Sequence, residues 1–335
     1  MSDPDELSIS DPDAVETAAR TAIEQCLAVE AGETCVVVTD DKRAPIGEAI
    51  YRATLEVTDD ATIVRYPPGP QHGAEPPAPV AAALGAADAF LAPTTKSITH
   101  TRARSAATKA GARGATLPGI TEQVFTVGLD ADYEAIEAEC AAMLGRVEGA
   151  EEIRVASPQG TDISFELGDR PWKDDTGIVH DSGSFSNLPA GEVFISPESA
   201  DGTYVVDGTI RPHGRLEDGH QVTFEVEAGT VTDVSDDAVR ADLEAAAESV
   251  GADAYNLAEL GIGTNIGVTE LVGSVLLDEK AGGTVHIAVG DDAGIGGDVD
   301  APIHLDGILT EPTVFVDGEE ITLPSVEQSD GDGRS

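Results

Sequence analysis

The spacing of apolar residues changes near the middle of the chain. In the first half, apolar residues recur every three to four positions in long segments, which predicts amphipathic helices, and short apolar runs between them predict buried strands. The helical segments are 14–31 and 46–57, and the strand segments are 34–41, 61–66 and 88–95. This alternation of strand and helix predicts an open, mostly parallel α/β domain over residues 1–128.

The second half follows a two-residue period. After an amphipathic segment at 130–150, apolar and polar residues alternate in short runs separated by turn residues, with one acidic helix at 236–251 among them. The runs are 152–168, 203–210, 221–234, 285–290 and 312–324. We therefore expect an α+β C-terminal domain with mostly antiparallel strands over 129–326, followed by a disordered acidic tail at 327–335.

The net charge of the chain limits the classes of molecule that it could bind. The chain has 63 acidic and 19 basic residues, a formal net charge of −44, and only five lysines. Such a surface repels nucleic acid and anionic membranes, so we expect neither as a partner. Because molar salt screens charge repulsion to within about 3 Å, this composition also indicates a halophilic source.

The number and spacing of the cysteines and the N-terminal sequence indicate the cellular compartment of the protein. Cys26, Cys35 and Cys140 form neither a disulfide framework nor a CxxC metal pair, which suits a reducing cytoplasm. The first 20 residues are acidic where a signal peptide is basic and then apolar, and no apolar run approaches the ~20 residues of a membrane span. We expect a cytoplasmic protein.

Two of the seven histidines lie in a glycine- and aspartate-rich stretch near the C-terminal end. His286 falls within the strand pattern VHIAVG, and His304 and Asp306 would share one face of the extended segment IHLDG. Two imidazoles with carboxylates suit Zn²⁺, Co²⁺, Mn²⁺ or Fe²⁺. However, seven histidines in so acidic a chain give about one H-x-[DE] motif by chance, so spacing alone leaves a metal site and a chance match equally open.

Two glutamates occupy unusual settings. Glu192 follows the turn NLPAG and precedes the strand VFISP, and Glu259 lies in the apolar, glycine-punctuated run YNLAELGIG. A buried carboxylate is costly unless it is paired or bound to a metal. Each residue is thus either a metal ligand or an exposed carboxylate at the surface.

The order of four motifs, NLPAGEVFISP, AELGIGTN, DEKAGGTVHIAVGD and HLDG, resembles the C-terminal domain of the aminopeptidase T/aminopeptidase S family of metallopeptidases, also called leucyl aminopeptidases. The resemblance extends over about residues 115–310. It implies two divalent ions, Zn²⁺, Co²⁺ or Mn²⁺, that activate a water to remove the N-terminal residue of short peptides, in a homodimer. The implied ligands are Glu192, Glu259, His286, His304 and Asp306, and Glu279 is the implied proton shuttle.

The chain departs from that family in three respects. It is shorter, and more residues separate Glu279 from His286 than in that family. The tyrosine expected soon after the histidine is replaced by the run GDDAG at 290–294. The length and the GTVHIAxGD form are similar to the 2,5-dihydroxypyridine 5,6-dioxygenases, ring-opening enzymes that use one Fe²⁺. In that alternative His286, His304 and Asp306 bind the iron, and Glu192 and Glu259 do not.

Two further interpretations remain. His100, Arg102 and Arg104 form a cationic cluster that could hold a substrate carboxylate, line a cleft at the domain junction or serve as an inter-domain salt-bridge patch. The chain could also be a non-catalytic ligand-binding module, in which case the histidines near the C-terminal end would be ordinary core residues.

Overall fold

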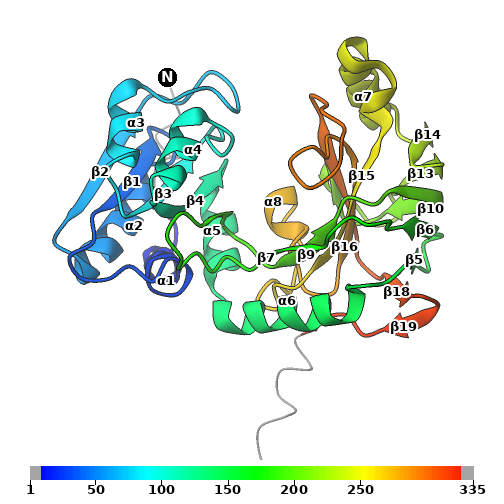
Figure 1. The fold of residues 1–335 in the computed structure, drawn as a ribbon, viewed down its shortest axis with the longest axis horizontal. Helices are drawn as coiled ribbons and strands as arrows, with labels where there is room; N and C mark the ends of the chain where they lie inside the picture. The colour runs from blue at the N-terminus through cyan, green and yellow to red at the C-terminus, as the bar shows by residue number, and fades with distance from the viewer. Residues whose placement is uncertain (1–8, 326–335) are drawn as a thin grey trace, which may run out of the picture. The chain divides into compact units, whose positions relative to one another are not determined.

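The computed structural model describes residues 9–325, which fall into two compact units (Figure 1). Among the described residues, the first unit comprises 9–137 and 175–190, and the second comprises 138–174 and 191–325. The acidic tail expected at 327–335 lies outside the described residues. One sheet is parallel and the others are antiparallel, so the predicted fold class is confirmed.

A five-stranded parallel sheet forms the centre of the first unit, in the order β2-β1-β3-β4-β8. Each strand segment predicted in this half of the chain is present. The strands are β1 (Cys35–Asp40), β2 (Ala61–Tyr66), β3 (Ala89–Thr94), β4 (Arg113–Pro118) and β8 (Phe185–Asn187). The helices are α1 (Pro12–Thr21, extended by a π-helical turn at Ala22–Cys26), α2 (Ala44–Val57), α3 (Ala78–Leu84), α4 (Arg102–Lys109) and α5 (Glu122–Leu129).

Helices cover both faces of this sheet (Figure 1). Val36 and Val38 of β1 point toward one face, where they pack with Leu84 of α3 in a buried cluster. Helices α1, α2 and α5 pack together, and α2 also contacts β1, β2 and β3. Because both faces are covered, the central strands β1 and β3 are buried along their whole length and consist of continuous, mostly apolar runs instead of alternating ones.

The division of the chain differs from the expected single boundary at 128/129. Residues 175–190 return to the first unit, where β8 pairs with β4 as the last parallel strand. Helix α6 (Tyr133–Val147) begins in one unit and ends in the other. Strand β8 has three residues and lies in a serine-rich segment, so no apolar run marks it in the sequence.

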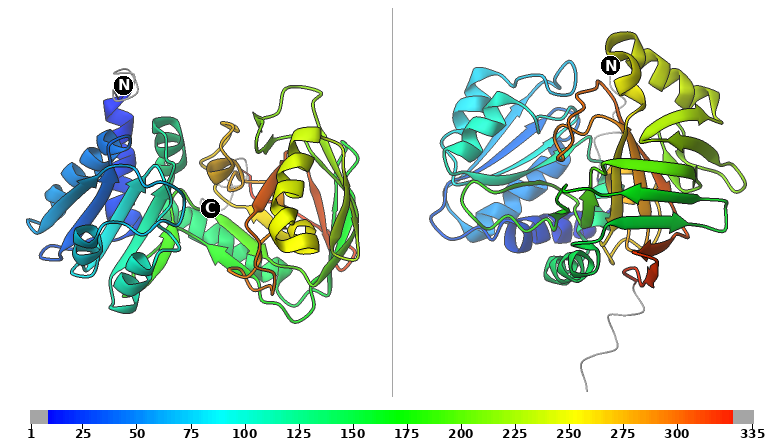
Figure 2. Two further views of the ribbon diagram at one scale, coloured as in Figure 1. Left: turned by 90° about the horizontal axis from the view of Figure 1, so that it is seen from above. Right: turned by 45° about the vertical axis from the view of Figure 1, so that its right-hand side comes forward.

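Two seven-stranded sheets form most of the second unit, and Figure 2 shows them as two layers. One has the order β14-β13-β10-β6-β5-β18-β19, and the other has the order β12-β11-β17-β16-β15-β9-β7. The first sheet contains β5 (Glu152–Ala156), β6 (Asp162–Glu166), β10 (Ser199–Val206), β13 (Val222–Glu227), β14 (Thr230–Val234), β18 (Thr313–Val316) and β19 (Glu319–Ile321). The second contains β7 (Lys173–Asp175), β9 (Glu192–Ile195), β11 (Thr209–Ile210), β12 (Gly214–Arg215), β15 (Leu257–Gly263), β16 (Val285–Gly290) and β17 (His304–Leu309).

The second of these sheets has one apolar face. Leu260 of β15 and Ile287 of β16 are direct cross-strand partners, and both are completely buried. The predicted acidic helix is α7 (Asp237–Val250), which continues into a 3-10 turn at Gly251–Tyr255, and a short helix α8 (Val275–Asp278) precedes β16. The apolar face anchors the central strands, whose other face carries the ionisable side chains described below.

Two features of the described residues bear on the expected compartment: the lengths of the helices and the state of the cysteines. No helix within residues 9–325 is long and apolar enough to cross a membrane. Cys26, Cys35 and Cys140 are buried thiols, and burial raises the pKa of Cys35 to about 12. Because the thiolate is the reactive and metal-binding form, Cys35 is a packing residue.

Candidate metal centre

Five ionisable side chains from four neighbouring strands share one face of the β9-β15-β16-β17 part of the sheet. Glu259 and Asp306 both lie opposite Ala288 of the central strand β16. His286 lies two residues before Ala288 and therefore points to the same side. The five residues are Glu192 on β9, Glu259 on β15, His286 on β16, and His304 and Asp306 on β17.

Glu259 lies between the two histidines. Its Oε1 is 3.2 Å from Nε2 of His286, and its Oε2 is 3.2 Å from Nε2 of His304. Asp306 Oδ1 is 3.3 Å from the same His304 nitrogen, and Glu192 Oε2 is 3.5 Å from His286 Nε2. The side chains therefore form two groups of three potential ligands that share Glu259: Glu192 with Glu259 and His286, and Glu259 with His304 and Asp306.

Burial and mutual charge shift the pKa values of His286 and Glu259. Burial lowers the pKa of His286, but the hydrogen bond with Glu259 and the charge of Glu192 outweigh it and raise that pKa to about 9. Burial raises the pKa of Glu259, but hydrogen bonds from both histidines outweigh it and lower that pKa to about 2. Glu259 thus remains charged at neutral pH, which favours a cation beside it.

Glu279 and Lys280 complete the cluster. The ammonium of Lys280 is 2.8 Å from Glu192 Oε1 and 2.6 Å from Glu279 Oε1, and only 3% of its side chain is exposed. Burial raises the pKa of Glu279 to about 7, although the charge of Lys280 opposes the shift. Glu279 therefore exchanges a proton near neutral pH, as a general acid or base requires.

The orientation of the side chains fits a metal ion. His304 Nδ1 is 2.7 Å from the carbonyl oxygen of Asp291, so Nδ1 donates to it, and Nε2, which faces the carboxylates, is the atom that would bind an ion after losing its proton. Glu192 Oε2 and His286 Nδ1 are buried and have no hydrogen-bond partner. A buried carboxylate oxygen without a donor is unfavourable, and a cation beside Glu192 would remove that cost.

The predicted cationic cluster has other partners. Arg102 is 91% exposed and pairs with Glu75 at 3.2 Å. Arg104 donates through Nε to the carbonyl of Thr99 at 2.6 Å, and its guanidinium lies 4.2 Å from the centre of the Phe185 ring. His100 is exposed. All of these contacts lie within the first unit, so none of them is an inter-domain salt bridge.

Lys280 is the residue of the cluster that the sequence analysis missed. Its signal in the sequence was weak: it is one of only five lysines, and it lies between Glu279 and the glycine-rich segment AGG at 281–283. The carbonyl of Asp291 could not have been identified from residue types, because every residue carries one.

The sequence of the chain matches one family of known proteins. A sequence profile of the NicX family, 2,5-dihydroxypyridine 5,6-dioxygenase, matches residues 15–326. No protein with a curated description matches the chain by sequence.

Two solved structures share the fold over nearly their whole length. The 2,5-dihydroxypyridine dioxygenase of Pseudomonas putida KT2440 is 19% identical with a TM-score of 0.75, covering 94% of this chain and 97% of that one. Wild-type AmpT from Thermus thermophilus is 18% identical with a TM-score of 0.64, covering 92% of this chain and 99% of that one. The resemblance to aminopeptidases is thus supported for the fold.

The profile match extends across most of the chain and includes every residue of the cluster. An enzyme family of this kind, together with the buried histidine and carboxylate groups, supports an enzyme with a metal ion as cofactor, in place of a non-catalytic binding module. The chain belongs to the NicX family of 2,5-dihydroxypyridine 5,6-dioxygenases.

Proposed function

We propose that the chain is an iron(II)-dependent dioxygenase that opens the ring of a dihydroxylated pyridine. The family match over residues 15–326 supports the reaction class. His286, His304 and Asp306 would hold the ion, since two imidazoles and one carboxylate are the ligand set of many non-haem Fe²⁺ oxygenases. Iron(II) in such a set supplies the redox chemistry that lets dioxygen react with an aromatic ring.

The observation that carries the proposal is the ammonium of Lys280 at 2.8 Å from Glu192. This buried charge already neutralises a carboxylate that a second metal ion would need. The cluster contains four carboxylates, at Glu192, Glu259, Glu279 and Asp306, and Lys280 pairs with the first and third of them. The pKa of Glu279 is raised to about 7. When Glu279 is protonated and both histidines are neutral, as metal ligands must be, the cluster with Lys280 keeps two negative charges, which one divalent ion balances and two would exceed.

Glu279 has a role in this reaction. A dihydroxypyridine must lose a hydroxyl proton to bind a cation as a chelating anion. Glu279 would accept that proton when it is ionised, and Lys280 at 2.6 Å keeps the carboxylate oriented. The same group could return the proton to the opened product.

Metal analysis combined with oxygen uptake tests the proposal. Protein purified anaerobically in molar KCl should contain about one iron per chain and should consume oxygen when 2,5-dihydroxypyridine is added. Two zinc, cobalt or manganese ions per chain, with no oxygen uptake after iron loading, would contradict it.

A second candidate is the two-metal aminopeptidase, which the position of Glu259 favours. Each oxygen of this carboxylate faces a different histidine at 3.2 Å, which is how a carboxylate bridges two ions. Hydrolysis of the N-terminal residue from short peptides, with two divalent ions per chain, would establish this function instead.

A further inference from the structure

A second group of potential metal ligands lies in the second unit, apart from the cluster of Glu259. His213 is in the turn between β11 and β12, His220 is in the loop before β13, and Asp236 immediately precedes α7. Nε2 of His213 is 3.0 Å from Asp236 Oδ1, and Nε2 of His220 is 3.7 Å from Asp236 Oδ2. The same ring nitrogen of each histidine thus faces one carboxylate.

We infer that His213, His220 and Asp236 form a binding site for a divalent transition-metal ion, with zinc as the best match. Two imidazoles and one carboxylate are a common ligand set for this ion. Their ligand atoms all lie within 4.8 Å of one another. This inference does not depend on the proposed function.

The arrangement of the rings matches tetrahedral coordination. The ring centres of His213 and His220 are 5.2 Å apart with an interplanar angle of 71°. An ion ~2.0–2.1 Å from each ring nitrogen, at a tetrahedral angle, would place the ring centres roughly 5 Å apart. The rings therefore need little movement to bind one ion.

The carboxylate is held in place before any ion binds. Asp236 Oδ1 accepts hydrogen bonds from the backbone N–H groups of Ala238 and Val239, each at 3.0 Å, and so caps the first turn of α7. Oδ2 makes neither of these bonds and faces His220. Outer hydrogen bonds that fix a ligand in this way strengthen metal sites.

The side chains are accessible enough for exchange with solvent. His213, His220 and Asp236 have 27%, 45% and 17% of their side chains exposed. Water can therefore occupy the fourth position of a tetrahedral ion. A chain with a net charge of −44 also attracts divalent cations from solution.

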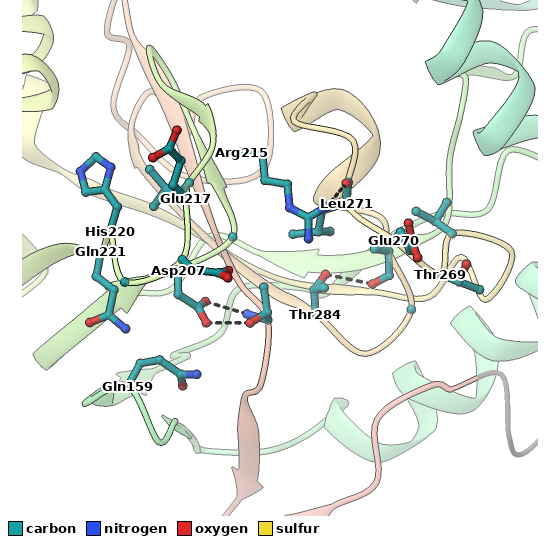
Figure 3. A pocket seen from close by; sticks show the side chains of 18 residues that line it. Gln159, Asp207, Arg215, Glu217, His220, Gln221, Thr269, Glu270, Leu271 and Thr284 are labelled. Atoms are coloured by element: carbon teal, nitrogen blue, oxygen red, sulfur yellow. Dashed lines mark hydrogen bonds between the residues drawn. The ribbon is translucent and has the colours of Figure 1, made fainter.

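The site borders a cavity of about 600 Å³. Figure 3 shows His220 with Glu217 and Gln221 along one side of this cavity. These residues belong to the loop between β12 and β13, which an ion would tie to the first turn of α7. Metal binding would therefore fix one wall of the cavity.

Zinc titration of the full-length protein tests the inference. After the Glu259 cluster has been loaded, the wild type should bind one more Zn²⁺ per chain than the His213→Ala/His220→Ala double variant. His100→Ala, which removes an exposed histidine of the first unit, should bind as many ions as the wild type. Equal stoichiometry and affinity in the wild type and the double variant would overturn the inference.

Two further measurements separate a lost site from a damaged fold. Asp236→Asn keeps a good capping acceptor but loses the charge, so it should retain the helix and bind the additional zinc at least about 10-fold more weakly. The His304→Ala variant, in contrast, should bind the additional zinc as the wild type does. Zinc should also slow amide hydrogen exchange at 216–221 in the wild type alone, and identical protection in the double variant would contradict the proposed link to the loop.

Discussion

Gly261 and His286 face each other across the β15–β16 pair, and there is no room for a side chain between them. A Cβ at Gly261 would lie 2.0 Å from His286 Nε2, the atom that points toward Glu259. The absence of a side chain at this position therefore allows the imidazole to turn toward the carboxylates.

We expect Gly261→Ala to displace the imidazole and to weaken metal binding by about 10–100-fold or more, since even outer-shell changes have effects of that size. Isothermal titration with Fe²⁺ or Zn²⁺ would measure the change. Gly145→Ala is the matched control, because Gly145 is on the exposed side of α6 with no atom near its Cβ position. Unchanged affinity in Gly261→Ala would show that His286 is not a ligand.

Replacing Lys280 removes the ammonium that pairs with two carboxylates of the cluster. Lys280→Met takes this partner away from Glu192 and Glu279, and we expect the free energy of unfolding of the metal-free protein to fall by about 3–5 kcal/mol. Added divalent metal should restore stability and raise the metal content of the Glu259 cluster toward two ions. Lys42→Met, at an exposed lysine, should change neither quantity in denaturant titrations or metal analysis.

Truncating His304 tests the ligand assignment directly. His304→Ala should lose the metal bound by the Glu259 cluster while the far-ultraviolet circular dichroism spectrum stays unchanged, because a third of this side chain is exposed and the ring is not part of the apolar core. Elemental analysis after dialysis provides the measurement. Retention of that metal in the variant would remove His304 from the ligand set.

The stability of the metal-free protein should depend on pH through His286. Its pKa is raised from 6.5 to about 9 in the folded protein, so its stabilising contribution is complete below pH 6.5 and is lost as the pH rises through 9. We therefore expect the Tm of the metal-free protein to fall between pH 6.5 and 9 at constant salt. His286→Asn should show a smaller fall over the same range, and an equal fall would assign the effect to other groups.

Glu259 should make the stability of the metal-free protein depend on pH in the acidic range. Its pKa is lowered from 4.5 to about 2, so its stabilising contribution is present above pH 4.5 and is lost as the pH falls through 2.

In the metal-bound protein the ion replaces the proton on His286, so the fall in Tm between pH 6.5 and 9 should be smaller than in the metal-free protein.

Local patterns were sufficient to predict the main elements. The apolar runs that became β1, β2 and β3 and the amphipathic segment that became α2 follow from side-chain period alone. The shared face of His304 and Asp306 follows from alternation along β17. Strand β8 escaped prediction because three residues pairing with β4, which is about 70 positions earlier in the chain, leave no periodic signal.

The sequence by itself determined the fold class, the order of the elements and the residue types available to hold a metal, because these depend on local spacing and on which side chains are present. Only the tertiary structure decided that Glu259 lies between the two histidines and that Lys280 neutralises Glu192. Those relationships depend on the register of strands β9, β15, β16 and β17, which are separated by up to about 110 residues along the chain. Cross-strand register is set by packing of the apolar face, so it cannot be predicted from any short segment of the sequence.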